Sequence, residues 1–424
     1  MLNFKTFLRE QDIYEEDDLL LTEAAATAQS ENDDKGKLHE LLLAKYLHPE
    51  QKLPEHHRSF SENEDHAGTP EQVHDRLKEK MGKAAYSEID KHAKQTAASI
   101  HTHLANQGHV GNAQGHHIGS VFWTSNADRE NTAGDHEKTT GVKDVNSNAD
   151  LIVRVHDKRG KTVGHHGISA KYGSQEPNYR NPGLESLEKM SGIASGTFAK
   201  HMSDHKARMD ELGFTGSADN RNYQTKIDEM AEKGGVDAVR DVFNKHQQTL
   251  DNGGKLKAKD KLMHANAQAF IENHDANKSA KAKKDFINKA AMRAATARDS
   301  NILARKNIAK DFHAALSKKK PEELAQLVRD SVSPPTHIPH LVAHSKVKPD
   351  GSADSIVKPS HSLADDHLAQ FDMNTLSPHV GAGTSVTLKA KHLKTGKMTN
   401  VALMNIKSSS GAHKGSVGTL KLKS

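Results

Sequence analysis

Three residues around one predicted hairpin have the types and spacing needed for metal-dependent phosphodiester chemistry. Asp150 precedes the apolar run "LIVRVH", whereas Ser169 and Lys171 lie in the next run, "TVGHHGISAKYG". Hydrolysis with a divalent metal needs carboxylates that hold the ion, an activated water and positive charge beside the developing oxyanion. Mg²⁺ prefers oxygen ligands and keeps several of its waters, so a few carboxylates suffice. These residues therefore indicate a metal-binding edge of a sheet.

A bent β-hairpin would position these side chains. The two runs alternate apolar with polar residues, and Gly160 lies in the short turn between them. Successive side chains of a strand point to opposite faces, so Ser169 and Lys171 share one face while Ala170 faces the core. The second strand lacks a carboxylate, and a serine occupies the position where a metal ligand is expected.

The arrangement of Asp150 with Ser169-Ala170-Lys171 resembles the signature of the PD-(D/E)xK nuclease superfamily. "NAD" stands where the family usually has Pro-Asp, and "SAK" stands where the family has (D/E)xK. A type II restriction endonuclease-like branch of the family carries this S-x-K variant. The opening "MLNFKTFLREQ" also resembles the starts of tailed-phage proteins, which suggests a phage-encoded member.

In the branch with the serine variant, a glutamate of the helix after the hairpin supplies the lost carboxylate. Thirteen residues separate Lys171 from Glu185, as in the family. Glu185 lies in the first turn of a helix that "NPG" is expected to open, and Glu188 is the alternative one turn later. The family also often places a glutamate on an early helix that faces the site. Glu40, in "KLHELLLAKYL", matches that position, although a solvated helix face is the alternative.

The resemblance implies a role for each of these residues. Asp150 and Glu185 would hold Mg²⁺ or Mn²⁺, with the backbone carbonyl of Ala170 as a further ligand. Lys171 would position or deprotonate the attacking water and stabilise charge in the transition state. Ser169 would support the metal ligands without binding the ion itself.

Adjacent histidines occur at residues 56–57, 116–117 and 165–166. Zinc sites need ligands that converge from fixed spacings, and no such spacing is present, so we expect no structural metal site from these pairs. His165 and His166 would lie on opposite faces of the second strand, so at most one of them could reach the metal-binding edge. His116 or His117 could instead contact phosphate.

The composition limits the class of protein. The chain has 424 residues, of which 34% are hydrophobic, 4% aromatic and 27% charged, with a formal net charge of +5. Cysteine is absent, which excludes a disulfide framework and a thiolate metal site. The start lacks the apolar core of a signal peptide, and no run approaches the ~20 apolar residues that span a membrane. We therefore expect a soluble protein of the bacterial or infected-host cytoplasm.

The periodicity and the resemblance together predict an α/β protein with a central mixed sheet flanked by helices, a restriction endonuclease-like core. A helical segment (1–34) precedes a nuclease-like core (35–215), which a long helical, lysine-rich region (216–330) follows. The interval 331–365 carries five prolines and is expected to be a linker or loop. Residues 366–424 predict a small antiparallel β unit, which could be separate or could complete the core sheet. Residues 254–320 are rich in alanine and lysine and have few large apolar residues, so we expect exposed helices without a compact core there.

These observations favour a Mg²⁺-dependent DNA endonuclease, with DNA as its partner and a homodimer as an open arrangement. The lysine-rich helices could bind the DNA backbone through counterion release, or they could be merely solvated. Two alternatives remain open. One is a non-catalytic phage virion or ejected internal protein, and the other is a nucleic-acid-binding protein on a degenerate nuclease fold.

Overall fold

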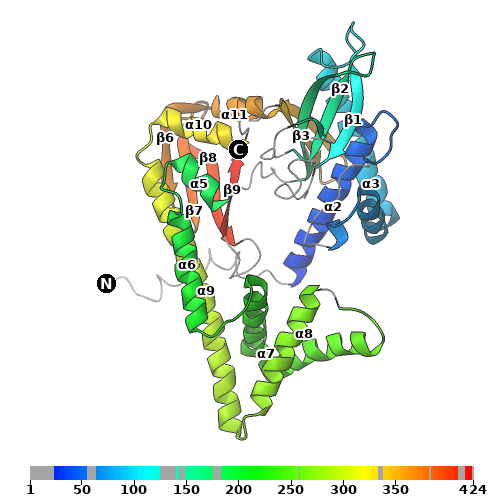
Figure 1. The fold of residues 1–424 in the computed structure, drawn as a ribbon. Coiled ribbons are helices and arrows are strands. Elements are labelled where there is room, and N and C mark those ends of the chain that lie inside the picture. The colour runs from blue at the N-terminus through cyan, green and yellow to red at the C-terminus, as the bar shows by residue number, and fades with distance from the viewer. Residues whose placement is uncertain are drawn as a thin grey trace. The chain divides into compact units, whose positions relative to one another are not determined.

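The fold divides into two compact units (Figure 1). The first unit comprises residues 1–180, 325–373 and 392–396, and the second comprises the remainder. The computed structural model describes residues 23–54, 64–124, 140–142, 149–174, 183–256, 258–332, 338–381, 383–408 and 416–422. Within these residues, no helix is both long enough and apolar enough to cross a membrane.

The first unit contains a five-stranded mixed sheet in the order β1-β2-β3-β4-β5. Pairing is antiparallel except between β3 and β4, which run parallel. The strands are β1 (His117–Trp123), β2 (Leu151–His156), β3 (Thr162–Gly173), β4 (His340–Val347) and β5 (Ala353–Pro359). The predicted hairpin is the β2–β3 pair, in which Asp157 Oδ1 accepts hydrogen bonds from the backbone N–H groups of Arg159 and Lys161 and so fixes the turn.

Two long helices, α2 (Glu23–Leu47) and α3 (Pro70–Asn106), cover one face of this sheet. Their buried side chains share a core with alternate strand residues, among them Leu151, Val153 and Val155 of β2. Helix α3 begins with a reciprocal capping box that Thr69 and Gln72 form. The short helices η1 (Glu64–His66) and α11 (Ser360–Leu368) also belong to this unit.

The prediction of a linker over 331–365 was wrong. This interval contains β4 and β5, and β4 is an interior strand of the core sheet, between β3 and β5. Three of these prolines lie within the described residues: Pro339 directly precedes β4, Pro349 is in the turn between β4 and β5, and Pro359 is the last residue of the edge strand β5. Proline is tolerated at such positions because no ladder hydrogen bond is lost there.

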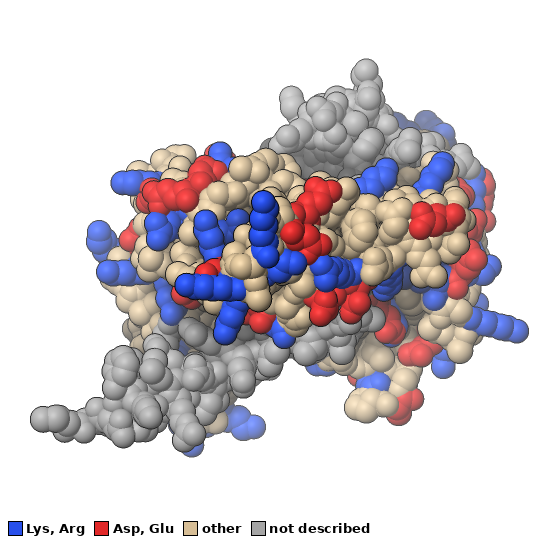
Figure 2. Space-filling model, turned by 90° about the horizontal axis from the view of Figure 1, so that it is seen from below, with Lys and Arg blue, Asp and Glu red and all other residues tan. Residues whose placement is uncertain are grey.

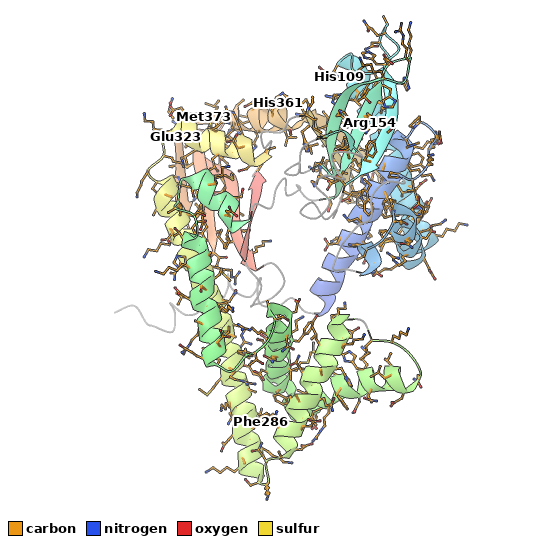
Figure 3. All side chains as sticks on the ribbon, in the orientation of Figure 1. His109, Arg154, Phe286, Glu323, His361 and Met373 are labelled. Carbon is orange, nitrogen blue, oxygen red and sulfur yellow. The ribbon has the colours of Figure 1, made fainter. Side chains whose placement is uncertain are left out.

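The helices of the second unit follow one another along the chain. They are α5 (Leu184–Ser191), α6 (Thr197–Glu211), α7 (Ala218–Asp251), α8 (Ala258–Asp275), α9 (Ala280–Leu316) and α10 (Pro321–Val332), the last of which ends in the first unit. The expectation that the lysine-rich helices lack a compact core was wrong. Ile227, Val239 and Phe270 are buried between α7, α8 and α9, and Phe286 packs against them (Figure 3). Buried alanines, including Ala267 and Ala290, let the helices approach closely with few large side chains.

Several arginines of these helices form ion pairs with carboxylates of the same unit. Arg240 contacts Asp275 at 2.7 Å, Arg293 contacts Asp228 at 2.7 Å, and Arg298 contacts Glu232 at 3.3 Å. On the molecular face in Figure 2, acidic and basic side chains are interspersed and neither sign forms a continuous patch. The binding of DNA by the lysines of these helices stays a prediction.

The C-terminal strands form a sheet of their own, which answers the question that the sequence left open. This second sheet has the order β6-β7-β8-β9. Its strands are β6 (Phe371–Val380), β7 (Ser385–His392), β8 (Met398–Ser408) and β9 (Ser416–Leu422). The predicted fold class is therefore confirmed: an α/β protein with a mixed central sheet, flanking helices and a separate antiparallel sheet near the C-terminus.

Candidate active site

Asp150 lies immediately before β2, where neighbouring strands hold its backbone from both sides. Its N–H donates to the carbonyl of Ile168 at 2.8 Å, and its carbonyl accepts from the N–H of Thr124 at 2.9 Å. Thr124 Oγ1 also donates to the carbonyl of Ala149 at 2.7 Å. The backbone on which the Asp150 carboxylate stands is thus fixed by β1 and β3 before any ligand arrives.

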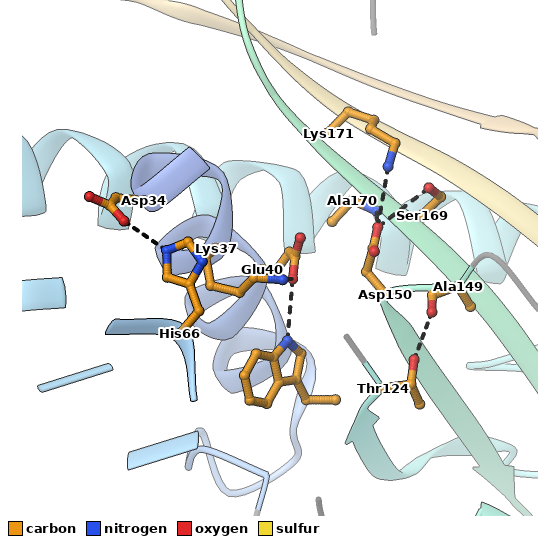
Figure 4. A network of polar contacts seen from close by, with 11 residues as sticks. Asp34, Lys37, Glu40, His66, Thr124, Ala149, Asp150, Ser169, Ala170 and Lys171 are labelled. Carbon is orange, nitrogen blue, oxygen red and sulfur yellow. Dashed lines mark hydrogen bonds and ion pairs between the residues drawn. The ribbon is translucent and has the colours of Figure 1, made fainter. Parts of the chain in front are cut away.

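The Asp150 carboxylate reaches across the end of β2 to β3 (Figure 4). Its Oδ2 accepts hydrogen bonds from the backbone N–H of Ala170 at 2.9 Å, from Ser169 Oγ at 3.4 Å and from Lys171 Nζ at 3.4 Å. Its Oδ1 accepts no hydrogen bond from the residues that the structure describes. The sequence expectation that Asp150, Ser169, Ala170 and Lys171 lie together is therefore met, and one carboxylate oxygen is available to a further ligand.

The alternation along β3 follows the prediction. Ala170 is buried in the core under α2 and α3, whereas Lys171, on the opposite face, keeps 24% of its side chain exposed. Pairing with β2 ends at Ile168, and β3 continues to Gly173 beside β4 alone among the described strands. The N–H and C=O of one strand residue point to the same side, so the Ala170 carbonyl faces the Asp150 side of β3.

Glu40 of α2 contributes a second carboxylate to the same neighbourhood. Its Oε2 accepts hydrogen bonds from Lys37 Nζ at 3.0 Å and from Trp123 Nε1 at 3.3 Å. Its Oε1 takes no hydrogen bond from the described residues, and in Figure 4 the carboxylate is directed toward that of Asp150. The glutamate is only 13% exposed, so it is not a solvated helix position.

The electrostatics link Glu40 to the rest of the site. Burial raises the pKa of Glu40, the ammonium of Lys37 lowers it, and the charge of Asp150 raises it further. The ammonium of Lys171 also lowers this pKa. The charges of the two carboxylates therefore act on each other, and two lysines partly compensate them. Each carboxylate keeps one oxygen that accepts no hydrogen bond from the described residues.

The glutamates predicted after the hairpin belong to the second unit. Glu185 occupies an exposed first-turn position of α5, as the sequence indicated, and its role as a metal ligand stays a prediction. Glu188 is buried, and its two oxygens accept the N–H groups of Gly196 at 2.8 Å and Phe198 at 2.6 Å, at the start of α6. These bonds engage both oxygens of the Glu188 carboxylate, and its role as the alternative metal ligand stays a prediction.

The histidine pairs lie outside this arrangement. His165 and His166 do point to opposite faces: His166 packs against His109, whereas His165 lies beside Gly141 (His109 is labelled in Figure 3). His116 contacts Asn112, and His117 contacts His156, so neither reaches Asp150 in the described structure. The pair at 56–57 lies outside the described residues.

Three contributions to the site were not predicted from the sequence. Lys37 precedes Glu40 by three positions, a helical spacing that could have identified the ion pair. Trp123, the one tryptophan of the chain, donates to Glu40 across 83 positions of sequence, which no local pattern indicates. His340, at the start of β4, lay in the supposed linker, yet the charges of Asp150 and Lys171 both act on its pKa.

The oxygen atoms around Asp150 are of the type that a divalent metal ion binds. In the part of the chain that the structure describes, no three side chains of His, Asp or Glu come together in a way that could hold a metal. A Mg²⁺ ion does not require three, because it is commonly held by one or two carboxylates together with waters and substrate phosphates. Asp150 Oδ1, Glu40 Oε1 and the Ala170 carbonyl are oxygen donors of the kind that Mg²⁺ and Mn²⁺ accept.

Comparisons with known proteins add little to this geometry. No family model matches the chain, and none of the curated proteins matches it. Among solved structures, it is similar to the restriction endonuclease MspI in complex with its cognate DNA, with 9% sequence identity and a TM-score of 0.23. The match covers 64% of this chain and 63% of that chain, less than two thirds of its length. A likeness at this score carries no argument about fold or function, so the candidate active site rests on its own residues.

Proposed function

We propose that the protein is a metal-dependent DNA endonuclease. One observation carries the proposal: the carboxylates of Asp150 and Glu40 lie in one electrostatic neighbourhood with Lys171, where β3 extends past the end of β2. The chemistry of these groups supports hydrolysis of a phosphodiester. DNA as the substrate follows from the resemblance of Asp150 and Ser169-Ala170-Lys171 to the nuclease signature.

The residues fit a divalent cation. Asp150 and Glu40 would hold Mg²⁺ or Mn²⁺ through the oxygens that carry no hydrogen bond, with the Ala170 carbonyl as a further donor. A cation would also relieve the mutual repulsion that contributes to the raised pKa of Glu40. When bound, the ion supplies Lewis-acid polarisation of a phosphate oxygen and lowers the pKa of water.

The other residues of the site orient the two carboxylates and partly compensate their negative charge. The N–H of Ala170 and the hydroxyl of Ser169 fix Oδ2 of Asp150, so that Oδ1 is directed outward without reorganisation. Lys171 holds a positive charge at the same carboxylate and would stabilise the charge that develops on the phosphate. Lys37 and Trp123 orient the Glu40 carboxylate in the same way, because both donate hydrogen bonds to its Oε2.

The test is cleavage of a supercoiled plasmid in Mg²⁺ or Mn²⁺, compared with EDTA. Asp150→Asn and Lys171→Ala are expected to lose cleavage by about 100-fold or more, because each removes a charge that acts on the reacting phosphate. Matched controls are Asp354→Asn and Lys161→Ala, which change exposed residues of β5 and of the β2–β3 turn and should cleave at the wild-type rate. Glu185→Gln tests the ligand that the resemblance implies.

Each other outcome points to a different protein. Cleavage that persists in EDTA, or that survives Asp150→Asn, contradicts the metal site. Binding of duplex DNA without any cleavage identifies a nucleic-acid-binding protein on the same fold. Neither binding nor cleavage of duplex or single-stranded DNA leaves the non-catalytic virion or ejected protein.

A further inference from the structure

His340 is a buried histidine whose ring has no hydrogen-bond partner among the described residues. It is 7% exposed, and both Nδ1 and Nε2 are enclosed without a donor or acceptor from the described chain. Buried polar groups are almost always paired, so an unpaired imidazole points to a partner that arrives from outside the protein or to a bound water.

The sheet places this ring on the face of the candidate active site. His340 pairs in register with Gly167 of β3, two residues before Ser169. On β4, Leu341 and Ala343 point into the core under α2 and α3, so His340 points to the opposite face, which it shares with Ser169 and Lys171.

A glycine makes room for the ring. A Cβ atom at Gly167 would lie 2.7 Å from Cδ2 of His340 and 3.2 Å from Cβ of Ala149, the residue before Asp150. The backbone of Gly167 does not have a positive φ, so the constraint is spatial rather than conformational. The hairpin thus carries a gap that seats His340 beside the residues that fix Asp150.

The ring is neutral at physiological pH. Burial lowers the pKa of His340 to about 4, the charge of Asp150 opposes this shift, and Lys171 adds to it. A neutral imidazole offers one N–H donor and one acceptor nitrogen. Beside a cationic lysine, the group best suited to accept from that N–H is an anionic oxygen.

We propose that His340 is a further residue of the active site and that its ring donates a hydrogen bond to a phosphate oxygen of the bound DNA strand. This inference rests on the proposed function and names the contact that the ring makes with that substrate. The ring nitrogens are enclosed in the free protein, so this contact requires that binding of the strand uncovers the ring.

The experiment compares His340→Leu with His340→Gln. Leucine keeps the volume and removes the donor, whereas glutamine keeps an N–H. We expect His340→Leu to lower kcat/KM for plasmid cleavage, and affinity for a labelled duplex in Ca²⁺, by about 10- to 100-fold, the effect of one hydrogen bond to a charged group. His340→Gln should restore most of both. Gly167→Ala should reproduce part of the loss by displacing the ring.

The thermal stability of His340→Leu distinguishes a role in phosphate binding from a role in packing. Replacing an unpaired buried imidazole by leucine removes an unsatisfied polar group, so the Tm of His340→Leu should equal or exceed that of the wild type. The matched control is His166→Leu, which removes an equally buried histidine of β3 that packs on His109, and it should leave cleavage unchanged.

Two results overturn the inference. One is wild-type cleavage and duplex affinity in His340→Leu. The other is a loss of activity that comes with a lowered Tm and is not restored by glutamine, which indicates a packing role. If the wild type binds duplex but does not cleave, the proposed function fails by itself, and the affinities of the two variants in Ca²⁺ still decide the role of His340.

Discussion

At the scale of single residues, the candidate active site places charges where they are costly for folding. Glu40 is 13% exposed and lies near the charge of Asp150, so its ionised form is less favourable in the folded protein than in water. Lys37 and Trp123 reduce this cost without removing it, since the pKa of Glu40 stays above its ordinary value. A carboxylate whose ionised form is destabilised in this way is typical of a site that binds a ligand.

Removing the charge of Glu40 should therefore increase the free energy of unfolding. Because burial raises the pKa of Glu40 above 4.5, the folded protein binds that proton more tightly than the unfolded chain, and stability falls as pH rises through this range. Glu40→Gln keeps an acceptor for Trp123 and removes the charge. At pH 7.5 its free energy of unfolding should exceed that of the wild type by about 1.4 kcal/mol per unit of pKa shift, while its cleavage is lost.

Urea unfolding at pH 7.5 and pH 4 measures this difference, which should shrink at the lower pH because Glu40 of the wild type then carries its proton. A matched control is Glu50→Gln, which changes an exposed glutamate after α2 and should leave cleavage unaltered. A Glu40→Gln protein that is less stable than the wild type at pH 7.5 would show that the ion pair with Lys37 outweighs the burial of the charge.

At the scale of elements, a buried polar chain joins the helices to the strands behind the site. Ser345 Oγ of β4 contacts His39 Nε2 of α2 at 2.7 Å and Thr96 Oγ1 of α3 at 2.6 Å. The ring of His39 lies 4.9 Å from that of Tyr172. His39 precedes Glu40 and Tyr172 follows Lys171, so this chain fixes the helix and the strand that carry two groups of the candidate active site.

Ser345→Ala should therefore destabilise the protein by about 1–3 kcal/mol, because it leaves His39 and Thr96 buried without their shared partner. Ser355→Ala is the matched control, since the hydroxyl of Ser355 on β5 is enclosed and has no hydrogen-bond partner among the described residues. Urea denaturation of both variants provides the measurement. Equal stabilities would show that the polar chain does not join the elements.

How much the sequence could predict depends on the range of the contacts. The β2–β3 hairpin and the cluster of Asp150 with Ser169 and Lys171 were predictable, because alternation and a short turn bring these residues together locally. The β4–β5 pair was missed because its register with β3 is set by contacts between residues far apart in the chain. The hydrogen bond from Trp123 to Glu40 and the seat of His340 are long-range as well, and no spacing reveals them.

At the scale of the whole molecule, the two units differ in the buried groups whose pKa is strongly shifted. The first buries neutral histidines: burial lowers the pKa of His39 to about 3 and that of His166 and His340 to about 4. The second buries Asp228, whose pKa is raised to about 6 by burial although Arg293 opposes the shift. These groups respond to acid in opposite directions.

The signs follow from the proton affinities of the folded and unfolded states. A histidine with a lowered pKa gives stability above pH 6.5 that is lost as the pH falls toward the folded value, because the unfolded chain then binds more protons. Each such histidine costs up to about 1.4 kcal/mol per pH unit below 6.5. Asp228, with a raised pKa, instead favours folding as the pH falls below 6.

We therefore expect acid to destabilise the first unit selectively, because its three buried histidines outnumber Glu40, whose raised pKa acts in the opposite direction. Trp123 is the one tryptophan of the chain and is buried in the first unit, so its fluorescence reports that unit, whereas circular dichroism at 222 nm reports helices of both units. At pH 7.5 the two signals should change at similar urea concentrations.

At pH 5 the Trp123 transition should move to lower urea and separate from the helical signal, because the two units then no longer unfold as one state. His39→Gln, which removes the most strongly shifted of these histidines, should reduce the separation. Coincident transitions at pH 5 would contradict a selective loss of the first unit.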